Sequence, residues 1–192
     1  MRPGPVLRRP STAALIAGLL LASPAAGAEI EGVRFAEARR VEGFDLQLHG
    51  VGLLRYRFVV KAYVAALYLG EGSSARDVLA DSPRRLEIEY FWPIAAADFA
   101  RATREGIGRT RDAAAFAALR DRIERLNDSY RDVERGDRYA LTYLPGFGTE
   151  LAKNGERLCV IEGADFAAAI FAIWLGPAPL DRSLKSQLLG AP

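Results

Sequence analysis

Arg55, Lys61 and Tyr63 are the residues of this chain whose types and spacing best suit ligand chemistry. They lie in the segment 53–69, in which apolar and aromatic residues fill the even positions. Arg55, Lys61 and Tyr63 all stand at odd positions of this segment. Alternate side chains of one extended strand point to opposite faces, so the three would share a cationic face. A guanidinium offers a fork of donors that matches a carboxylate or a polarised carbonyl, and a neighbouring phenol can donate or stack.

Two interpretations of this cationic face stay open. If the face lines a cleft, it predicts a binding site for an anionic or carbonyl-bearing apolar ligand. If it faces water, the charges only keep the sheet soluble, which is the usual situation of Lys and Arg in proteins.

The other chemistry-bearing residues have ordinary structural explanations. Residues 145–149, Pro-Gly-Phe-Gly-Thr, lack the Lys-Ser/Thr ending of a phosphate loop and predict a hairpin turn. His49 is the only histidine, Cys159 is the only cysteine and no dinucleotide fingerprint is complete, so we expect no metal and no cofactor. Glu87 and Glu89 alternate with apolar residues, which predicts a solvated outer face of a strand.

The first 28 residues predict an export signal. Three arginines precede an apolar run at 13–21, and Ala-Gly-Ala follows at 26–28 as a small-residue cleavage pattern. The run is shorter than the about 20 apolar residues that span a bilayer. We therefore expect a signal peptide over 1–28, cleavage after Ala28, no stable membrane anchor, and a periplasmic or secreted protein.

The remaining residues, 29–192, predict one domain with a substantial core. The whole chain has 26 basic and 24 acidic residues, and the leader carries three arginines and no acid, which leaves 23 basic residues against 24 acidic. A protein that binds nucleic acid normally carries a basic excess that neutralises phosphates. The balanced charge therefore argues against a nucleic-acid partner.

Side-chain periodicity predicts the elements that would position these residues. Strand patterns, with a tight turn at Asn154-Gly155, occur over 33–41, 44–52, 53–69, 84–92, 138–144, 149–153 and 156–162. Helical spacing occurs over 94–111, 112–127, 164–175 and 181–189, and a short helix is predicted to end at Leu79. This order indicates an α+β fold, in which helices pack on one face of a large antiparallel sheet.

Six sequence motifs occur along the chain in a recognisable order: Lys61–Leu69 (KAYVAALYL), Gly136-Asp137, Tyr143–Thr149 (YLPGFGT), Asn154-Gly155, Ile173–Gly176 (IWLG) and Pro179–Lys185 (PLDRSLK). Together they resemble the exported bacterial branch of the chalcone isomerase-like family, over about residues 31–190. The resemblance implies an open-faced β-sandwich with a ligand cleft between the sheet and the helices. Some members of that family close a flavanone ring without a cofactor, and others bind fatty acids.

The resemblance also implies roles for single residues. Arg55 matches the arginine that meets the oxygen-bearing end of the ligand. Tyr63 and Asp181 stand where the enzymes have a strand threonine and a late serine or threonine, and no Tyr or Asn occurs between Trp92 and Leu126, where they place two further donors. Losing one such donor can cost about 10²-fold or more in rate, so this pattern favours binding over catalysis.

Three functions are compatible with these observations. The first is a non-catalytic binding protein for a small amphipathic anion such as a fatty acid, with Arg55 clamping the carboxylate and Tyr63 assisting. The second is a cofactor-free intramolecular lyase of the chalcone isomerase type that acts on a phenolic ligand, with Arg55 stabilising enolate charge. The third is an envelope protein that meets an unknown protein partner, its cleft filled by its own side chains.

Overall fold

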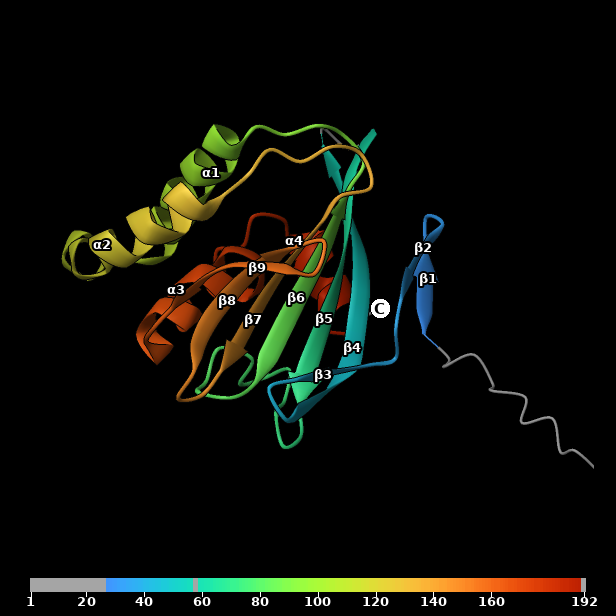
Figure 1. Cartoon of the computed structure of the whole chain (residues 1–192), viewed down its shortest axis with the longest axis horizontal. Coiled ribbons are helices and arrows are strands. Elements are labelled where there is room, and N and C mark those ends of the chain that lie inside the picture. The colour runs from blue at the N-terminus through green and yellow to red at the C-terminus, as the bar shows by residue number, and fades with distance from the viewer. Residues whose placement is uncertain (1–26, 57–58, 191–192) are drawn as a thin grey trace, which may run out of the picture.

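A seven-stranded antiparallel sheet forms the centre of the molecule (Figure 1). The computed structural model describes residues 27–56 and 59–190. The strands pair in the order of the chain, and they are β3 Ala38–Val41, β4 Phe44–Tyr56, β5 Val60–Gly70, β6 Arg84–Tyr90, β7 Arg138–Leu144, β8 Gly148–Lys153 and β9 Glu156–Ile161. The predicted signal peptide lies almost wholly outside the described residues.

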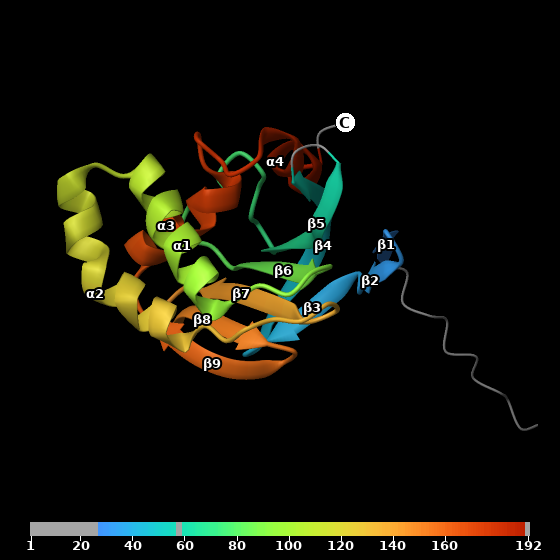
Figure 2. The same ribbon diagram turned by 90° about the horizontal axis from the view of Figure 1, so that it is seen from above.

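Four helices lie on one side of the curved sheet, as the view from above shows (Figure 2). They are α1 Ala96–Thr110, α2 Ala113–Ser129, α3 Ala164–Leu175 and α4 Arg182–Leu188. Their apolar side chains form one core with the sheet face beneath them. The predicted α+β fold, a large antiparallel sheet with helices packed on one face, is confirmed. Among the described residues, no helix is long and apolar enough to cross a membrane.

A small hairpin covers part of the opposite face of the sheet. It consists of β1 Ala28–Ile30 and β2 Val33–Phe35, and it shares a second core with residues of β4 and β5. The single strand predicted over 33–41 is therefore divided into β2 and β3. The short helix predicted before Leu79 is wrong, because that stretch forms a series of turns.

The prediction of one continuous strand over 53–69 is wrong as well. The segment belongs to two antiparallel strands, β4 and β5, in which Leu54 lies opposite Tyr63 and Arg55 lies opposite Lys61. Leu54 and Tyr63 both pack in the core beneath the helices, whereas Leu53 packs in the core on the other face. The register shifts directly after Leu54, so that Arg55, the neighbour of Leu54 on β4, lies opposite Lys61. Because successive strand residues point to opposite faces, Arg55 and Tyr63 belong to opposite faces of the sheet.

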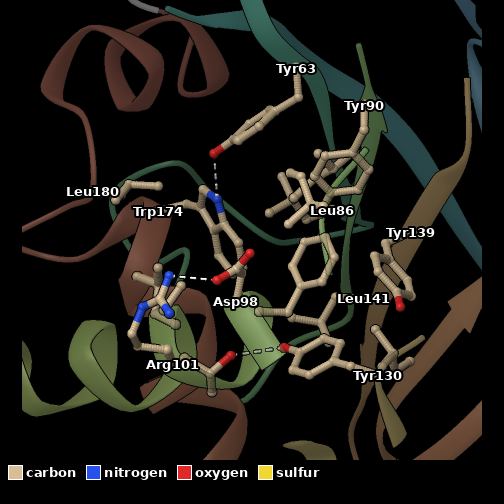
Figure 3. A pocket seen from close by; sticks show the side chains of 17 residues that line it. Tyr63, Leu86, Tyr90, Asp98, Arg101, Tyr130, Tyr139, Leu141, Trp174 and Leu180 are labelled. Carbon is tan, nitrogen blue, oxygen red and sulfur yellow. Dashed lines mark hydrogen bonds and ion pairs between the residues drawn. The ribbon is translucent and has the colours of Figure 1, made fainter. Parts of the chain in front are cut away.

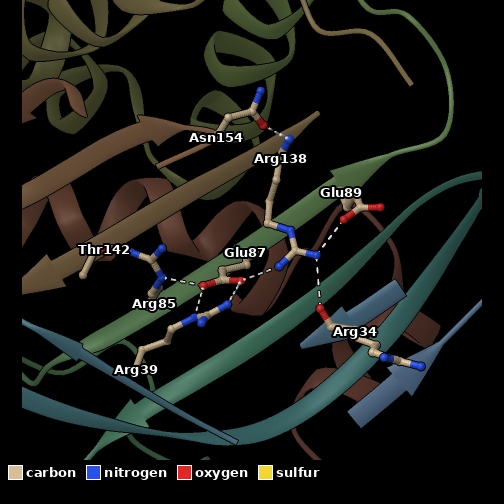
Figure 4. Close-up of polar contacts among 8 residues, drawn as sticks. All are labelled: Arg34, Arg39, Arg85, Glu87, Glu89, Arg138, Thr142 and Asn154. Carbon is tan, nitrogen blue, oxygen red and sulfur yellow. Dashed lines mark hydrogen bonds and ion pairs between the residues drawn. The ribbon is translucent and has the colours of Figure 1, made fainter. Parts of the chain in front are cut away.

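Glu87 is buried on the hairpin side of the sheet, where solvated carboxylates were predicted. Its carboxylate accepts two hydrogen bonds from Arg39, at 2.7 and 3.1 Å, one from Arg85 at 2.9 Å and one from Arg138 at 3.1 Å (Figure 4). Arg138 also donates to Glu89 at 2.6 Å and to the carbonyl of Arg34 in β2 at 3.2 Å. The prediction was wrong for Glu87 because β3 and the β1–β2 hairpin lie over it, and these contacts fasten the hairpin to the sheet.

Gly50 and Gly52 of β4 let helix α4 lie directly on the sheet. A Cβ atom at Gly50 would lie 2.5 Å from the carbonyl oxygen of Leu188 and 2.6 Å from that of Gln187, so the helix backbone would have to move. We expect Gly50→Ala to lower the free energy of unfolding by about 1–3 kcal/mol, the usual cost of overpacking. Urea denaturation followed by circular dichroism measures this loss.

Gly52→Ala is the matched control for this prediction. Its Cβ would meet the side chains of Leu184 and Gln187, at 2.8 and 3.0 Å, and side chains can move where backbone cannot. Gly52→Ala should therefore cost less than Gly50→Ala. An equal or larger loss at Gly52 would contradict the close approach of the α4 backbone.

Candidate ligand-binding cavity

A cavity of about 320 Å³ lies between the sheet and helices α1 and α3 (Figure 3). Strand β5 contributes Tyr63 to its lining, β6 contributes Leu86, β7 contributes Leu141, α1 contributes Phe99 and α3 contributes Trp174. This volume is at the lower end of the range of roughly 300–1,000 Å³ that small-molecule sites occupy. The predominantly apolar lining suits a small, largely apolar ligand.

Aromatic rings form much of the cavity wall, and they hold one another in place. Tyr90 meets Phe99 at 5.3 Å and Tyr63 at 5.7 Å between ring centroids, both edge to face, and Phe99 stacks on Tyr130 at 5.4 Å. Such pairs add to the stability gained by burial and fix ring orientation. Because the rings are mutually packed, the wall is preformed. The six aromatic lining residues are Tyr63, Tyr90, Phe99, Tyr130, Tyr139 and Trp174.

The tyrosine hydroxyl groups in this wall differ in what they can still bind. The hydroxyl of Tyr130 is hydrogen-bonded to Thr103 at 2.9 Å, and that of Tyr139 both donates to and accepts from the backbone of Arg131. The Tyr63 hydroxyl accepts from the indole N–H of Trp174 at 3.0 Å, and its own proton has no acceptor among residues 27–56 and 59–190. Tyr90 makes no side-chain hydrogen bond to the described residues. Tyr63 and Tyr90 can therefore each donate to an acceptor on a ligand.

These hydroxyl groups are proton donors at any physiological pH. Burial raises the pKa of Tyr63 well above its ordinary value; the hydrogen bond from Trp174 opposes this shift and the charge of Asp181 adds to it. Burial likewise raises the pKa values of Tyr90 and Tyr130. A phenol in this state can donate a hydrogen bond but cannot serve as a general base, since it does not ionise near neutral pH.

The cavity opens to solvent beside the first turns of α1. Asp98 and Arg101 lie there and form an ion pair of 2.6 Å between Oδ1 and Nη2 (Figure 3). Leu180, from the segment before α4, also lines the cavity and is exposed. Arg101 is the only Lys or Arg that lines this cavity among the described residues.

The structure separates the three residues that the sequence placed together. Tyr63 lines the cavity, but Arg55 and Lys61 do not. Both cations pair with Glu31, in the turn of the β1–β2 hairpin, with Arg55 Nη2 3.7 Å from Glu31 Oε1, and the Arg55 side chain is 45% exposed. The predicted shared face is wrong, because the sequence pattern concealed both the change of strand between β4 and β5 and the register shift that places Lys61 opposite Arg55.

The sequence interpretation also missed the residues that complete the cavity. Tyr90, Tyr130 and Arg101 were not singled out, and Trp174 was noted only as part of the IWLG motif. One signal for Arg101 was available: Asp98 and Arg101 are three residues apart on a helix and flank Phe99, so they border its apolar face.

Fold and cavity together define a class of protein: an antiparallel sheet covered by helices, with a small apolar cavity between the two layers. The chain belongs to the chalcone isomerase-like family, since the model of that family matches residues 27–190. The family expected from the sequence motifs is thus confirmed, while membership of its exported bacterial branch stays a prediction.

One solved structure of similar fold is that of a fatty-acid binding protein from Arabidopsis thaliana. It matches this chain with a TM-score of 0.64 and a sequence identity of 14%, and the match covers 82% of this chain and 92% of that chain. At this identity the likeness concerns the fold. A search of curated proteins found no match.

Proposed function

We propose that this protein binds a small amphipathic molecule, with a fatty acid as the first candidate, in the cavity between the sheet and helices α1 and α3. The observation that carries the proposal is the preformed aromatic cavity with Arg101 at its mouth. Its apolar wall suits an alkyl tail, and the cation and the two uncommitted hydroxyl groups suit an oxygen-bearing head. The likeness in fold to a fatty-acid binding protein supports the same choice.

Binding without chemistry fits this lining better than catalysis does. Closure of a flavanone ring needs stabilisation of enolate charge inside the cavity, the part that the resemblance gives to Arg55. Arg55 is paired with Glu31 outside the cavity lining, and the buried phenols that remain are weak acids. The third possibility, a module whose cleft is filled by its own side chains, fits an open cavity poorly.

The location of the protein is a separate proposal. We infer export to the periplasm or beyond from the arginines, apolar run and small residues of the first 28 positions.

Ala102 offers a direct test of binding, because it lines the cavity from an exposed position on α1. We expect residues 29–192 to bind dodecanoate with a stoichiometry of one in isothermal titration calorimetry. Ala102→Phe should weaken this affinity by about tenfold or more, since excluding two methylene groups from the cavity forfeits roughly 1.6 kcal/mol of burial.

Ala97→Phe is the control, because Ala97 is exposed on the same helix and does not line the cavity. It should bind dodecanoate as the wild type does. Failure of the wild type to bind fatty acids of 8 to 18 carbons, or equal affinities of the two phenylalanine variants, would refute the proposed site.

A further inference from the structure

The charges around the cavity distinguish its two ends. At the mouth, the guanidinium of Arg101 carries the one positive charge in the described lining. At the other end, Tyr63 is buried and its hydroxyl accepts a hydrogen bond from the indole N–H of Trp174 at 3.0 Å. A carboxylate beside Tyr63 would be deprived of water, and no Lys or Arg of the described lining lies at that end to pair with it, which disfavours an anionic head there.

A ligand carboxylate can readily replace Asp98 as the partner of Arg101. The Arg101 side chain is 66% exposed and that of Asp98 is 46% exposed, so solvent screens their attraction. One hydrogen bond, from Nη2 to Oδ1, joins them. Because a guanidinium has five N–H donors, Arg101 can receive a ligand carboxylate in addition to Asp98 or in its place.

The position of Arg101 suits a ligand whose tail enters the cavity. In Figure 3 the indole of Trp174 lies between the Tyr63 hydroxyl and the Asp98–Arg101 pair, so the two polar ends are on different sides of the ring. A carboxylate held by Arg101 stays hydrated at the mouth while its chain contacts the aromatic wall. The desolvation cost of the charge is thereby avoided.

We propose that Arg101 binds the acid group of the ligand at the mouth of the cavity, that Asp98 competes for Arg101 in the empty protein, and that the tail points inward toward Tyr63. This inference rests on the proposed function and specifies the orientation and charge of the ligand. It assigns the selection of acids over neutral lipids to one residue of α1, and it leaves Arg55 without a part in ligand binding.

A comparison of dodecanoate with 1-dodecanol tests the inference, since the two have chains of equal length and differ in head charge. Calorimetry on the wild type should show tighter binding of the acid. Arg101→Gln should lower the affinity for the acid by about tenfold, the usual effect of losing a hydrogen bond to a charged group, and leave the affinity for the alcohol unchanged. Asp98→Asn should tighten binding of the acid alone, because it removes the competing carboxylate.

Arg109→Gln provides the charge-matched control on the same helix, since Arg109 is exposed and does not line the cavity. It should leave both affinities unchanged. Equal effects of Arg101→Gln and Arg109→Gln on the acid, or loss of the acid preference in Tyr63→Phe or Arg55→Gln with Arg101 intact, would overturn the inference. If the wild type binds neither compound, the proposed function itself fails; if it binds both without regard to Arg101, only the orientation fails.

Discussion

Glu87→Ala is expected to lower the free energy of unfolding by about 3–5 kcal/mol, the cost of removing one partner from a buried ion pair. The Glu87 side chain is 1% exposed, and Arg39, Arg85 and Arg138 all donate to it. Without this carboxylate, three guanidinium groups converge on one place and lose their shared acceptor. Urea denaturation followed by circular dichroism measures the effect.

Glu89→Ala is the control for this experiment. Glu89 lies on the same strand and is bonded to Arg138, but its side chain is 20% exposed and it has one salt-bridge partner among the described residues. A partly exposed pair contributes on the order of 1 kcal/mol. If Glu87→Ala lowers the free energy of unfolding no more than Glu89→Ala does, the prediction is wrong and the burial of Glu87 does not increase its contribution to stability.

Glu87 should also contribute to the acid sensitivity of the fold. Burial alone would raise its pKa, but the hydrogen bonds and charges of Arg39 and Arg85 outweigh burial and hold the pKa below its ordinary value of 4.5. Because the pKa of Glu87 is lower in the folded protein than in the unfolded chain, its ionised carboxylate stabilises the fold above pH 4.5. This stabilisation is lost as the pH falls through the pKa of the folded protein. The stability of Glu87→Gln should accordingly depend less on pH below 4.5 than that of the wild type.

Arg84→Ala and Arg84→Met are expected to differ by about 2 kcal/mol or more in unfolding free energy. Arg84 is fully buried, and its guanidinium carbon lies 4.7 Å from the ring centroids of both Tyr143 and Phe171. It donates to the carbonyls of Ala80 and Ser82, whereas its Nε and Nη2 atoms have no hydrogen-bond partner in the part of the chain that the structure describes. Alanine leaves a cavity between the rings, which typically costs several kcal/mol in a core, whereas methionine fills the space.

Methionine should restore stability to within about 1 kcal/mol of the wild type, because it removes a buried charge as well as its hydrogen bonds. Burial lowers the pKa of Arg84 to about 10, which reflects the cost of keeping the cation in this position. Thermal or urea unfolding of both variants provides the measurement. Equal losses for alanine and methionine would contradict this prediction and assign the stability to the two carbonyl contacts instead.

Most of the elements could be predicted from local patterns. The Asn154-Gly155 turn indeed joins β8 to β9, with Lys153 opposite Glu156, because that dipeptide tolerates the positive backbone angles of a tight hairpin. The spacing of Phe166 and Ile170 predicted α3, and both residues are buried there. These features depend on neighbours in the chain, which a sequence displays directly.

The change of strand between β4 and β5 could not be predicted in the same way. No Gly, Pro, Asn or Asp interrupts residues 53–69, so alternation continues through the segment without a turn signal. A strand reversal inside such a pattern exchanges the faces that odd and even residues occupy. The expectation that Arg55 shares a face with Tyr63 was wrong for this reason, and of the two only Tyr63 lines the cavity.

The burial of Glu87 and the role of Arg101 depend on contacts distant in sequence. Glu87 alternates with apolar residues as a solvated strand residue would, and only the docking of β3 and the β1–β2 hairpin encloses it. Arg101 is one of several charged residues on α1, and only the packing of that helix above the sheet brings it to a cavity. Helical spacing could place Arg101 beside the apolar face of α1, but neither the enclosure of Glu87 nor the cavity beside Arg101 follows from periodicity.

The indole of Trp174 makes the cavity wall an optical reporter. The chain has two tryptophans, and the other one, Trp92, is 57% exposed. A guest that displaces water from the Trp174 ring would shift the emission of that ring toward shorter wavelengths, while Trp92 supplies a constant background. Occupancy is thereby readable from intrinsic fluorescence, without a dye or a label.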